Sequence, residues 1–146
     1  MARRGGRSAE VSLPAQPTAP GQARRFVTAT LDGWRVAGGD DVVLLVSELA
    51  TNALLHARTS MTVRVTEDGP DAVRLSVSDH SGELPRQRAL SVDAATGRGL
   101  ALLASIADAW GVETSAGGKT VWCRVLLDGS GSPSYGAFDV DAAEIL

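Results

Sequence analysis

The stretch Leu45-Val46-Ser47-Glu48-Leu49-Ala50-Thr51-Asn52-Ala53 decides the fold of this 146-residue chain. Its apolar side chains, with those on either side of it, cover more than half of a helix surface, which is typical of a mostly buried helix. The polar side chains gather on a narrow stripe, because residues four apart on a helix nearly superpose. We therefore predict a buried helix that begins near an N-cap at Asp40 and presents Glu48, Asn52 and His56 on one face.

This polar stripe offers two kinds of oxygen about one helical turn apart. Magnesium prefers a near-octahedral set of oxygens and often takes only one or two of them from the protein, so the Asn52 side chain could be a ligand. The neighbouring Glu48 carboxylate could accept a proton from an attacking hydroxyl or water. The same stripe is expected on an ordinary amphipathic helix whose wet face meets solvent, so by itself it leaves both interpretations open.

Three short motifs follow the predicted helix. Asp79-x-x-Gly82 ends an apolar strand, where a carboxylate can accept the exocyclic amine of adenine and a glycine lets a flat ring approach. Gly97-Arg98-Gly99-Leu100 precedes a predicted helix, where backbone N–H groups can bind phosphate. Gly118-Lys119-Thr120 opens a strand, and Thr120 offers a hydroxyl from the sheet. Each motif also occurs without a ligand, as a strand-to-loop turn or as glycines before a helix.

The spacing of these motifs differs from that of two common nucleotide-binding sequences. The dinucleotide fingerprint needs a third glycine after Gly99 and an acidic residue at a set distance, and neither is present. A Walker loop needs a glycine five positions before Gly118 and a helix after Thr120, whereas a strand is predicted there.

The remaining pattern predicts one domain of helices and strands. Further helices are expected at residues 20–34 and 100–110, and strands at residues 61–65, 73–77, 111–115 and 120–127. Residues 80–96 lack periodicity and are expected to form a loop that could close over a ligand. We place the domain at residues 13–127, after a flexible N-terminal arm at residues 1–12, with a possible edge strand at residues 11–13. A flexible acidic tail is expected at residues 128–146.

Composition narrows the range of partners. The net charge of −3 and pI near 5.3 provide no basic field for nonspecific nucleic-acid binding, so no direct nucleic-acid partner is expected. The single cysteine, Cys123, lies in an apolar run and is predicted to be a reduced core thiol. The longest apolar run, Val42 to Val46, is too short to span a membrane, and no signal-peptide core is recognised. We therefore expect a cytoplasmic protein.

Taken in this order and at these intervals, the four motifs resemble those of the GHKL ATP-binding superfamily, and most closely its anti-sigma-factor serine-kinase branch. Residues 45–53 look like the N box, residues 79–82 and 97–100 like the two glycine boxes, and residues 118–122 like the closing strand. The resemblance spans roughly residues 13–127. It implies an α+β two-layer sandwich, the Bergerat ATP-binding fold, with a mixed, mostly antiparallel sheet and helices on one face. ATP would lie between helix and sheet.

The resemblance also implies a role for each motif residue. Asn52 would bind Mg²⁺ and ATP, and Glu48 would act as the catalytic base. Asp79 would recognise adenine, with Thr120 assisting through water. The glycine boxes would line the nucleotide with Gly82, Gly97, Arg98, Gly99 and Leu100.

These roles imply a regulatory kinase. The protein would use ATP and Mg²⁺ to phosphorylate a serine on a small antagonist protein of the STAS type, and its ATP-bound form would sequester a sigma factor. By the same resemblance it is expected to be a homodimer.

Two positions depart from the family pattern. Glu83 stands where the first glycine box usually has a second glycine, and Leu55 stands where a basic residue often precedes the histidine. The loop from residue 83 to residue 96 is also short. These features favour an alternative function, a catalytically silent, ATP-gated protein-binding module in a bacterial signalling switch. A third interpretation is a free-standing ATP-binding partner of a histidine-kinase-like or GTPase signalling set.

Overall fold

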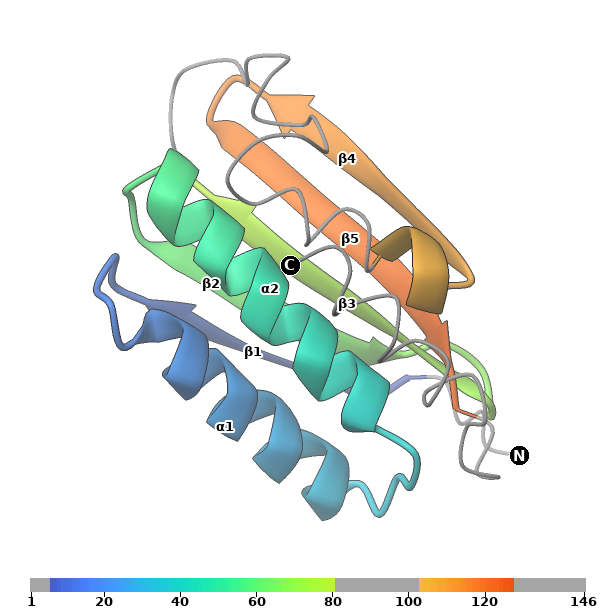
Figure 1. The fold of residues 1–146 in the computed structure, drawn as a ribbon. Helices are drawn as coiled ribbons and strands as arrows, with labels where there is room; N and C mark the ends of the chain where they lie inside the picture. Colours follow the sequence, from blue (N-terminus) through green and yellow to red (C-terminus); the bar gives the residue numbers. More distant parts are fainter. Residues whose placement is uncertain (1–5, 81–102, 128–146) are drawn as a thin grey trace.

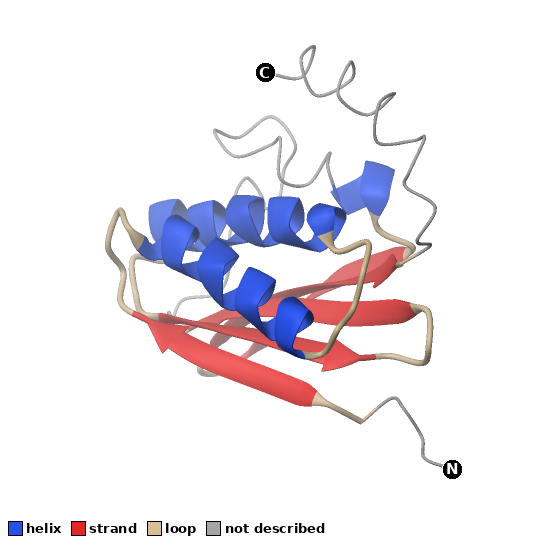
Figure 2. Ribbon diagram, turned by 90° about the horizontal axis from the view of Figure 1, so that it is seen from below, coloured by secondary structure: helices blue, strands red, loops and turns tan. Residues whose placement is uncertain are grey.

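The computed structural model describes residues 6–80 and 103–127, which form two layers. One layer is a sheet of five strands in the order β1-β2-β3-β5-β4, and the other contains two long helices that cover one face of that sheet (Figure 1; Figure 2). The strands are β1 (Ser8–Leu13), β2 (Met61–Glu67), β3 (Ala72–Asp79), β4 (Ala109–Ser115) and β5 (Gly118–Leu126), and the helices are α1 (Ala19–Gly33) and α2 (Asp40–His56). The structure thus confirms the predicted α+β two-layer sandwich.

Every strand pairing among the described residues is antiparallel, where a mixed sheet was expected. Short turns join β2 to β3 and β4 to β5, and a short turn can only return a strand antiparallel to its partner. The two hairpins meet where β3 pairs with β5, from Ala72 opposite Leu126 to Asp79 opposite Lys119. The end of β3 therefore lies beside the start of β5.

The core lies between the helices and the covered face of the sheet. Helix α1 buries Ala19, Ala23, Val27 and Leu31, one residue per turn, whereas α2 buries six apolar residues and is the more central helix. Alternate residues of the strands complete the core, as expected for a sheet covered on one side. They include Val63, Val65, Val73, Leu75, Val77, Cys123 and Val125. The predicted burial of Cys123 is confirmed.

The N-terminal boundary of the ordered sheet differs from the expectation. Residues 8–12, expected to belong to a flexible arm, form β1 with Leu13 and pair with residues 61–66 of β2. Arg7 strengthens this register, because its Nε and Nη2 donate hydrogen bonds of 2.9 and 2.6 Å to the buried Glu67 carboxylate. Only residues 11–13 were predicted as a possible edge strand, because the partner of β1, β2, lies far along the chain and Pro14 and Pro17 obscure the local pattern.

Two helix boundaries also differ. Helix α2 has its N-cap at Gly39, and Asp40 is already helical. A side chain at residue 39 would approach Leu31 Cδ1 to 2.5 Å, so close packing of α1 on the connection favours glycine there. The helix expected at residues 100–110 is described only at 103–106, and β4 begins at Ala109 because residues 109–115 extend the hairpin with β5.

The uncovered face of the sheet is polar. On this face the Arg74 guanidinium lies 4.0 Å from the centre of the Trp122 ring, and Arg124 forms ion pairs with Asp68 and Asp108. Within residues 6–80 and 103–127, no helix is long and apolar enough to cross a membrane.

Candidate functional site

Helix α2 carries the predicted polar stripe beside its buried face. Glu48 and Asn52 are partly buried, whereas His56, in the last turn, is exposed. Ser47 and Thr51, the other polar residues of this part of α2, form hydrogen bonds within the helical layer. The Ser47 hydroxyl accepts a hydrogen bond of 2.8 Å from Arg24 of α1, and the Thr51 hydroxyl donates one of 2.8 Å to the Ser47 carbonyl.

The Asn52 side chain is the best candidate for a ligand to a cation. Its Oδ1 atom is buried and accepts no hydrogen bond within the part of the chain that the structure describes. A buried amide oxygen without a partner is unfavourable, so such an atom calls for an unseen donor or ion. An amide oxygen suits Mg²⁺, and the residue therefore fits the predicted role.

Most ligands of a Mg²⁺ ion at Asn52 would come from outside the protein. Among residues 6–80 and 103–127, no group of three or more His, Cys, Asp or Glu side chains is arranged to hold a metal. Magnesium is commonly bound through one or two protein groups together with nucleotide phosphates and water, so a single amide ligand is compatible with this ion.

Asp79 lies at the end of β3 on the covered face of the sheet. Its carboxylate is buried, and the Oδ2 atom accepts a hydrogen bond of 2.8 Å from Lys119 Nζ. The two side chains are 3% and 13% exposed, and they come from residues directly opposite each other in the pairing of β3 with β5. The hydrogen bond between Lys119 and Asp79 is therefore charge-assisted and largely shielded from water. Lys119 is a site residue that the sequence analysis did not select.

Gly118 makes this arrangement possible. Its φ of +154° is a conformation that L side chains rarely adopt, and a side-chain carbon there would overlap the Asp79 carbonyl oxygen. The same carbon would lie 3.0 Å from the Asp79 carbonyl carbon and 3.2 Å from the His80 Cα. Glycine thus allows the start of β5 to pack directly against the end of β3.

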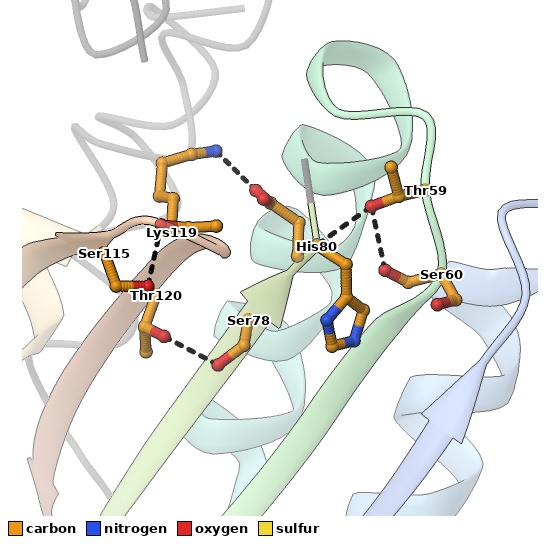
Figure 3. Close-up of polar contacts among 9 residues, drawn as sticks. Thr59, Ser60, Ser78, His80, Ser115, Lys119 and Thr120 are labelled. Carbon is orange, nitrogen blue, oxygen red and sulfur yellow. Dashed lines mark hydrogen bonds and ion pairs between the residues drawn. The ribbon is translucent and has the colours of Figure 1, made fainter. Parts of the chain in front are cut away.

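Thr120, which the resemblance assigns to adenine recognition through water, lies on the opposite face of the sheet from Asp79. Its hydroxyl is 2.7 Å from the Ser78 hydroxyl, on the face of the sheet turned away from the helices (Figure 3). Directly opposite residues share a face and successive residues alternate, so Asp79 shares its face with Lys119 and Ser78 with Thr120. The alternation of Lys119, Val121, Cys123 and Val125 could have indicated this.

Thr59 anchors the chain immediately after Asp79. Its hydroxyl accepts a hydrogen bond of 3.0 Å from the His80 backbone N–H and donates one of 3.0 Å to the Ser60 carbonyl (Figure 3). The connection between α2 and β2 is thereby tied to the end of β3. Sequence reasoning missed this residue, because a threonine in a loop has no local signature for such a contact.

The electrostatics link the end of α2 to the start of β5. Burial lowers the pKa of His56 from its usual value of 6.5, and the positive charge of Lys119 lowers it further. The charge on Lys119 therefore acts on the C-terminal end of the helix that carries Asn52. The end of α2 and the start of β5 are therefore close enough for their charges to interact.

Several predicted site residues lie outside the described part of the chain. These are Gly82, Gly97, Arg98, Gly99 and Leu100, together with Glu83 and nearly all of the loop expected at residues 80–96. Their roles remain predictions, as does the role of Glu48 as a base.

A buried helix with a cation-compatible amide oxygen, packed on an antiparallel sheet that ends in a buried carboxylate, is compatible with an ATP-binding α+β sandwich. The family model of the histidine kinase-like ATPase domain matches residues 13–125. The chain belongs to this family, whose members bind ATP, usually with Mg²⁺. A search among curated proteins finds no match to the chain.

Proposed function

We propose that this protein is an ATP-dependent serine kinase of the anti-sigma-factor type. It phosphorylates a serine on a STAS-type antagonist protein and, in its ATP-bound form, sequesters a sigma factor. The observation that carries the proposal is the buried Asn52 Oδ1 atom, which has no hydrogen-bond partner among the described residues and lies one helical turn after Glu48. A cation ligand next to a carboxylate is what phosphoryl transfer requires.

The two ends of the site have different roles, phosphoryl transfer at one and binding of adenine at the other. A Mg²⁺ ion bound at Asn52 would neutralise charge on the phosphates. The serine hydroxyl oxygen attacks the γ-phosphorus of ATP, and the bond from that phosphorus to the β,γ-bridging oxygen breaks to release ADP. Glu48 accepts the proton that the serine hydroxyl loses. Asp79 accepts a hydrogen bond from the adenine amine, so the base is held at the end of β3.

The partners are proposed from the motif pattern. Residues 45–53 and the motifs that follow them resemble the branch of the superfamily that switches between a sigma factor and a STAS-type antagonist. The histidine kinase-like ATPase family supports the nucleotide site that such a switch needs. We propose a homodimer and a cytoplasmic location on the same basis.

The proposal is tested by incubating the protein with Mg-ATP and each STAS-type protein of the same organism, and then mapping phosphoserine by mass spectrometry. We expect phosphorylation of one such protein, and a Glu48→Gln variant should be slower by about a hundredfold or more. The matched control is Glu113→Gln, which alters an exposed glutamate on β4 and should leave the rate unchanged.

Two outcomes would contradict parts of the proposal. Full phosphoryl transfer by Glu48→Gln would show that Glu48 is not the base. Partner binding that depends on ATP while every serine stays unmodified would identify the protein as an ATP-gated binding module instead of a kinase.

A further inference from the structure

We propose that Lys119 is a second base-recognition residue, whose ammonium group donates a hydrogen bond directly to N1 of adenine while Asp79 accepts one from the N6 amine. This inference rests on the proposed function, because it concerns the base end of the same ATP site. It assigns to a lysine the contact that the family resemblance assigns to Thr120 and a water molecule.

The positions of the Thr120 hydroxyl and the Lys119 ammonium group support this assignment. Thr120 faces away from the helices and is hydrogen bonded to Ser78, so its hydroxyl lies on the wrong face of the sheet to assist Asp79. Lys119 occupies the directly opposed position on the covered face, with Nζ 2.8 Å from Asp79 Oδ2. Of the charged and hydroxyl side chains of β5, Lys119 is therefore the one that lies beside Asp79.

The hydrogen-bonding capacity of Lys119 leaves room for a ligand. An ammonium group has three N–H donors, and within the described residues Lys119 donates only to Asp79. The lysine side chain is 13% exposed, so little water is available to satisfy the other two donors. Burying a charge with incomplete hydrogen bonding is costly, and a ligand acceptor at this position would reduce that cost.

The hydrogen-bonding groups of Asp79 and Lys119 are complementary to the adenine edge that carries N6 and N1. Adenine presents the N6 amine, a donor, next to N1, an acceptor. Asp79 and Lys119 present an acceptor next to a donor, so each base position meets its complement. Guanine presents O6, an acceptor, next to N1–H, a donor, and in the same orientation it would meet like groups. The pair therefore predicts selection of ATP over GTP.

Backbone contacts on both sides of the Asp79–Lys119 pair hold it in place. Gly118 allows the start of β5 to pack against the Asp79 carbonyl, and Thr59 fixes the backbone N–H of His80. Both contacts constrain the backbone on either side of the ion pair. Such preorganisation lowers the cost of ordering the two side chains when the base binds.

The test replaces single atoms of the base. Dissociation constants are measured for ATP, for 1-deaza-ATP, in which a C–H group replaces N1, and for purine riboside triphosphate, which lacks the N6 amine. The wild-type protein should bind ATP about tenfold to a hundredfold more tightly than 1-deaza-ATP, as expected for a charged hydrogen bond. Lys119→Met should bind these two nucleotides equally and lose selectivity against GTP. Both proteins should still discriminate against purine riboside triphosphate.

Two control variants make the comparison specific. Arg64→Met removes a positive charge from an exposed residue of β2 on the uncovered face and should leave every affinity unchanged. Lys119→Arg keeps a charged donor and should retain part of the discrimination against 1-deaza-ATP. If Lys119→Met fails to fold, Lys119→Arg takes its place, and discrimination against 1-deaza-ATP equal to that of wild type would then count against the direct contact.

The outcomes separate the inference from the function on which it rests. Equal wild-type affinity for ATP and 1-deaza-ATP would overturn the role of Lys119 while leaving the ATP site intact. Tighter binding of GTP than of ATP would also overturn it. If the wild-type protein bound no nucleotide at all, both the inference and the proposed function would fail.

Discussion

Substituting Gly118 by alanine should disrupt both the stability of the protein and the geometry of the site. Two costs are expected. A side chain at φ +154° strains the backbone by about 1–3 kcal/mol, and forcing a methyl group against the Asp79 carbonyl adds overpacking of about 1–3 kcal/mol. We therefore expect Gly118→Ala to lower the free energy of unfolding by roughly 2–6 kcal/mol.

The measurement is urea unfolding, with the free energy obtained by linear extrapolation. Gly117→Ala is the matched control, because the neighbouring glycine of the same turn has open space around a built Cβ and should change stability by no more than about 0.5 kcal/mol. Where Gly118→Ala remains folded, its affinity for Mg-ATP should also fall, since Lys119 and Asp79 are displaced. A Gly118→Ala variant as stable as Gly117→Ala would refute the close approach of β5 to β3.

Further predictions concern Cys123, His56 and Arg7. Burial raises the pKa of Cys123 to about 12, so a thiol reagent near neutral pH should label it only when the protein unfolds; fast labelling of folded protein would contradict its place in the core. The pKa of His56 in the folded protein is lowered below 6.5, so folding favours the neutral imidazole. The stability that His56 contributes is present above pH 6.5 and is lost as the pH falls through the folded pKa. His56→Gln should therefore lose less stability than wild type between about pH 7 and pH 5. By NMR titration, Lys119→Met should raise the His56 pKa only in part, because burial is the larger cause; an unchanged pKa would exclude the effect of Lys119. Arg7→Ala should lower the free energy of unfolding, because it removes the guanidinium group that is paired with the buried Glu67 carboxylate, and adding Glu67→Gln should recover part of that loss. Additive urea-unfolding effects of these two substitutions would contradict the pairing.

Local patterns in the sequence were sufficient to predict the central elements. Helix α2 has a long apolar surface with one polar stripe, and the hairpin of β2 and β3 alternates on both sides of a turn rich in Gly, Pro and Asp. These patterns depend on residues close together in the chain, so they can be recognised without knowledge of the tertiary structure. Asp79 at the end of β3 followed directly from them.

Features that depend on distant partners were harder to predict. β1 is short and was assigned in large part to a flexible arm, because its stability comes from pairing with β2 and from the contact of Arg7 with Glu67. The end of the helix near residue 106 was placed too late, since the competing structure is the hairpin of β4 with β5. In both cases tertiary pairing determined the outcome.

The site prediction selected Thr120, whereas the structure places Lys119 beside Asp79, for a similar reason. The family resemblance assigned the second contact to the Thr120 hydroxyl. Adjacent residues of a strand lie on opposite faces, and the register of β5 on β3 places Lys119 opposite Asp79. The role of Asn52 as a ligand stays a prediction, to which the structure adds that its Oδ1 atom is buried without a hydrogen-bond partner among the described residues.

The most direct test of the account is calorimetric titration of the wild-type protein with Mg-ATP, alongside an EDTA control, Asn52→Ala and Gln22→Ala. Gln22 is a matched control, because its Oε1 atom is likewise buried without a hydrogen-bond partner in the described part of the chain, but it belongs to α1. The account predicts saturable heat that requires Mg²⁺, is retained in Gln22→Ala and is lost in Asn52→Ala. No binding at about millimolar ATP, or equal binding by Asn52→Ala and wild type, would contradict the assignment of an ATP site at Asn52.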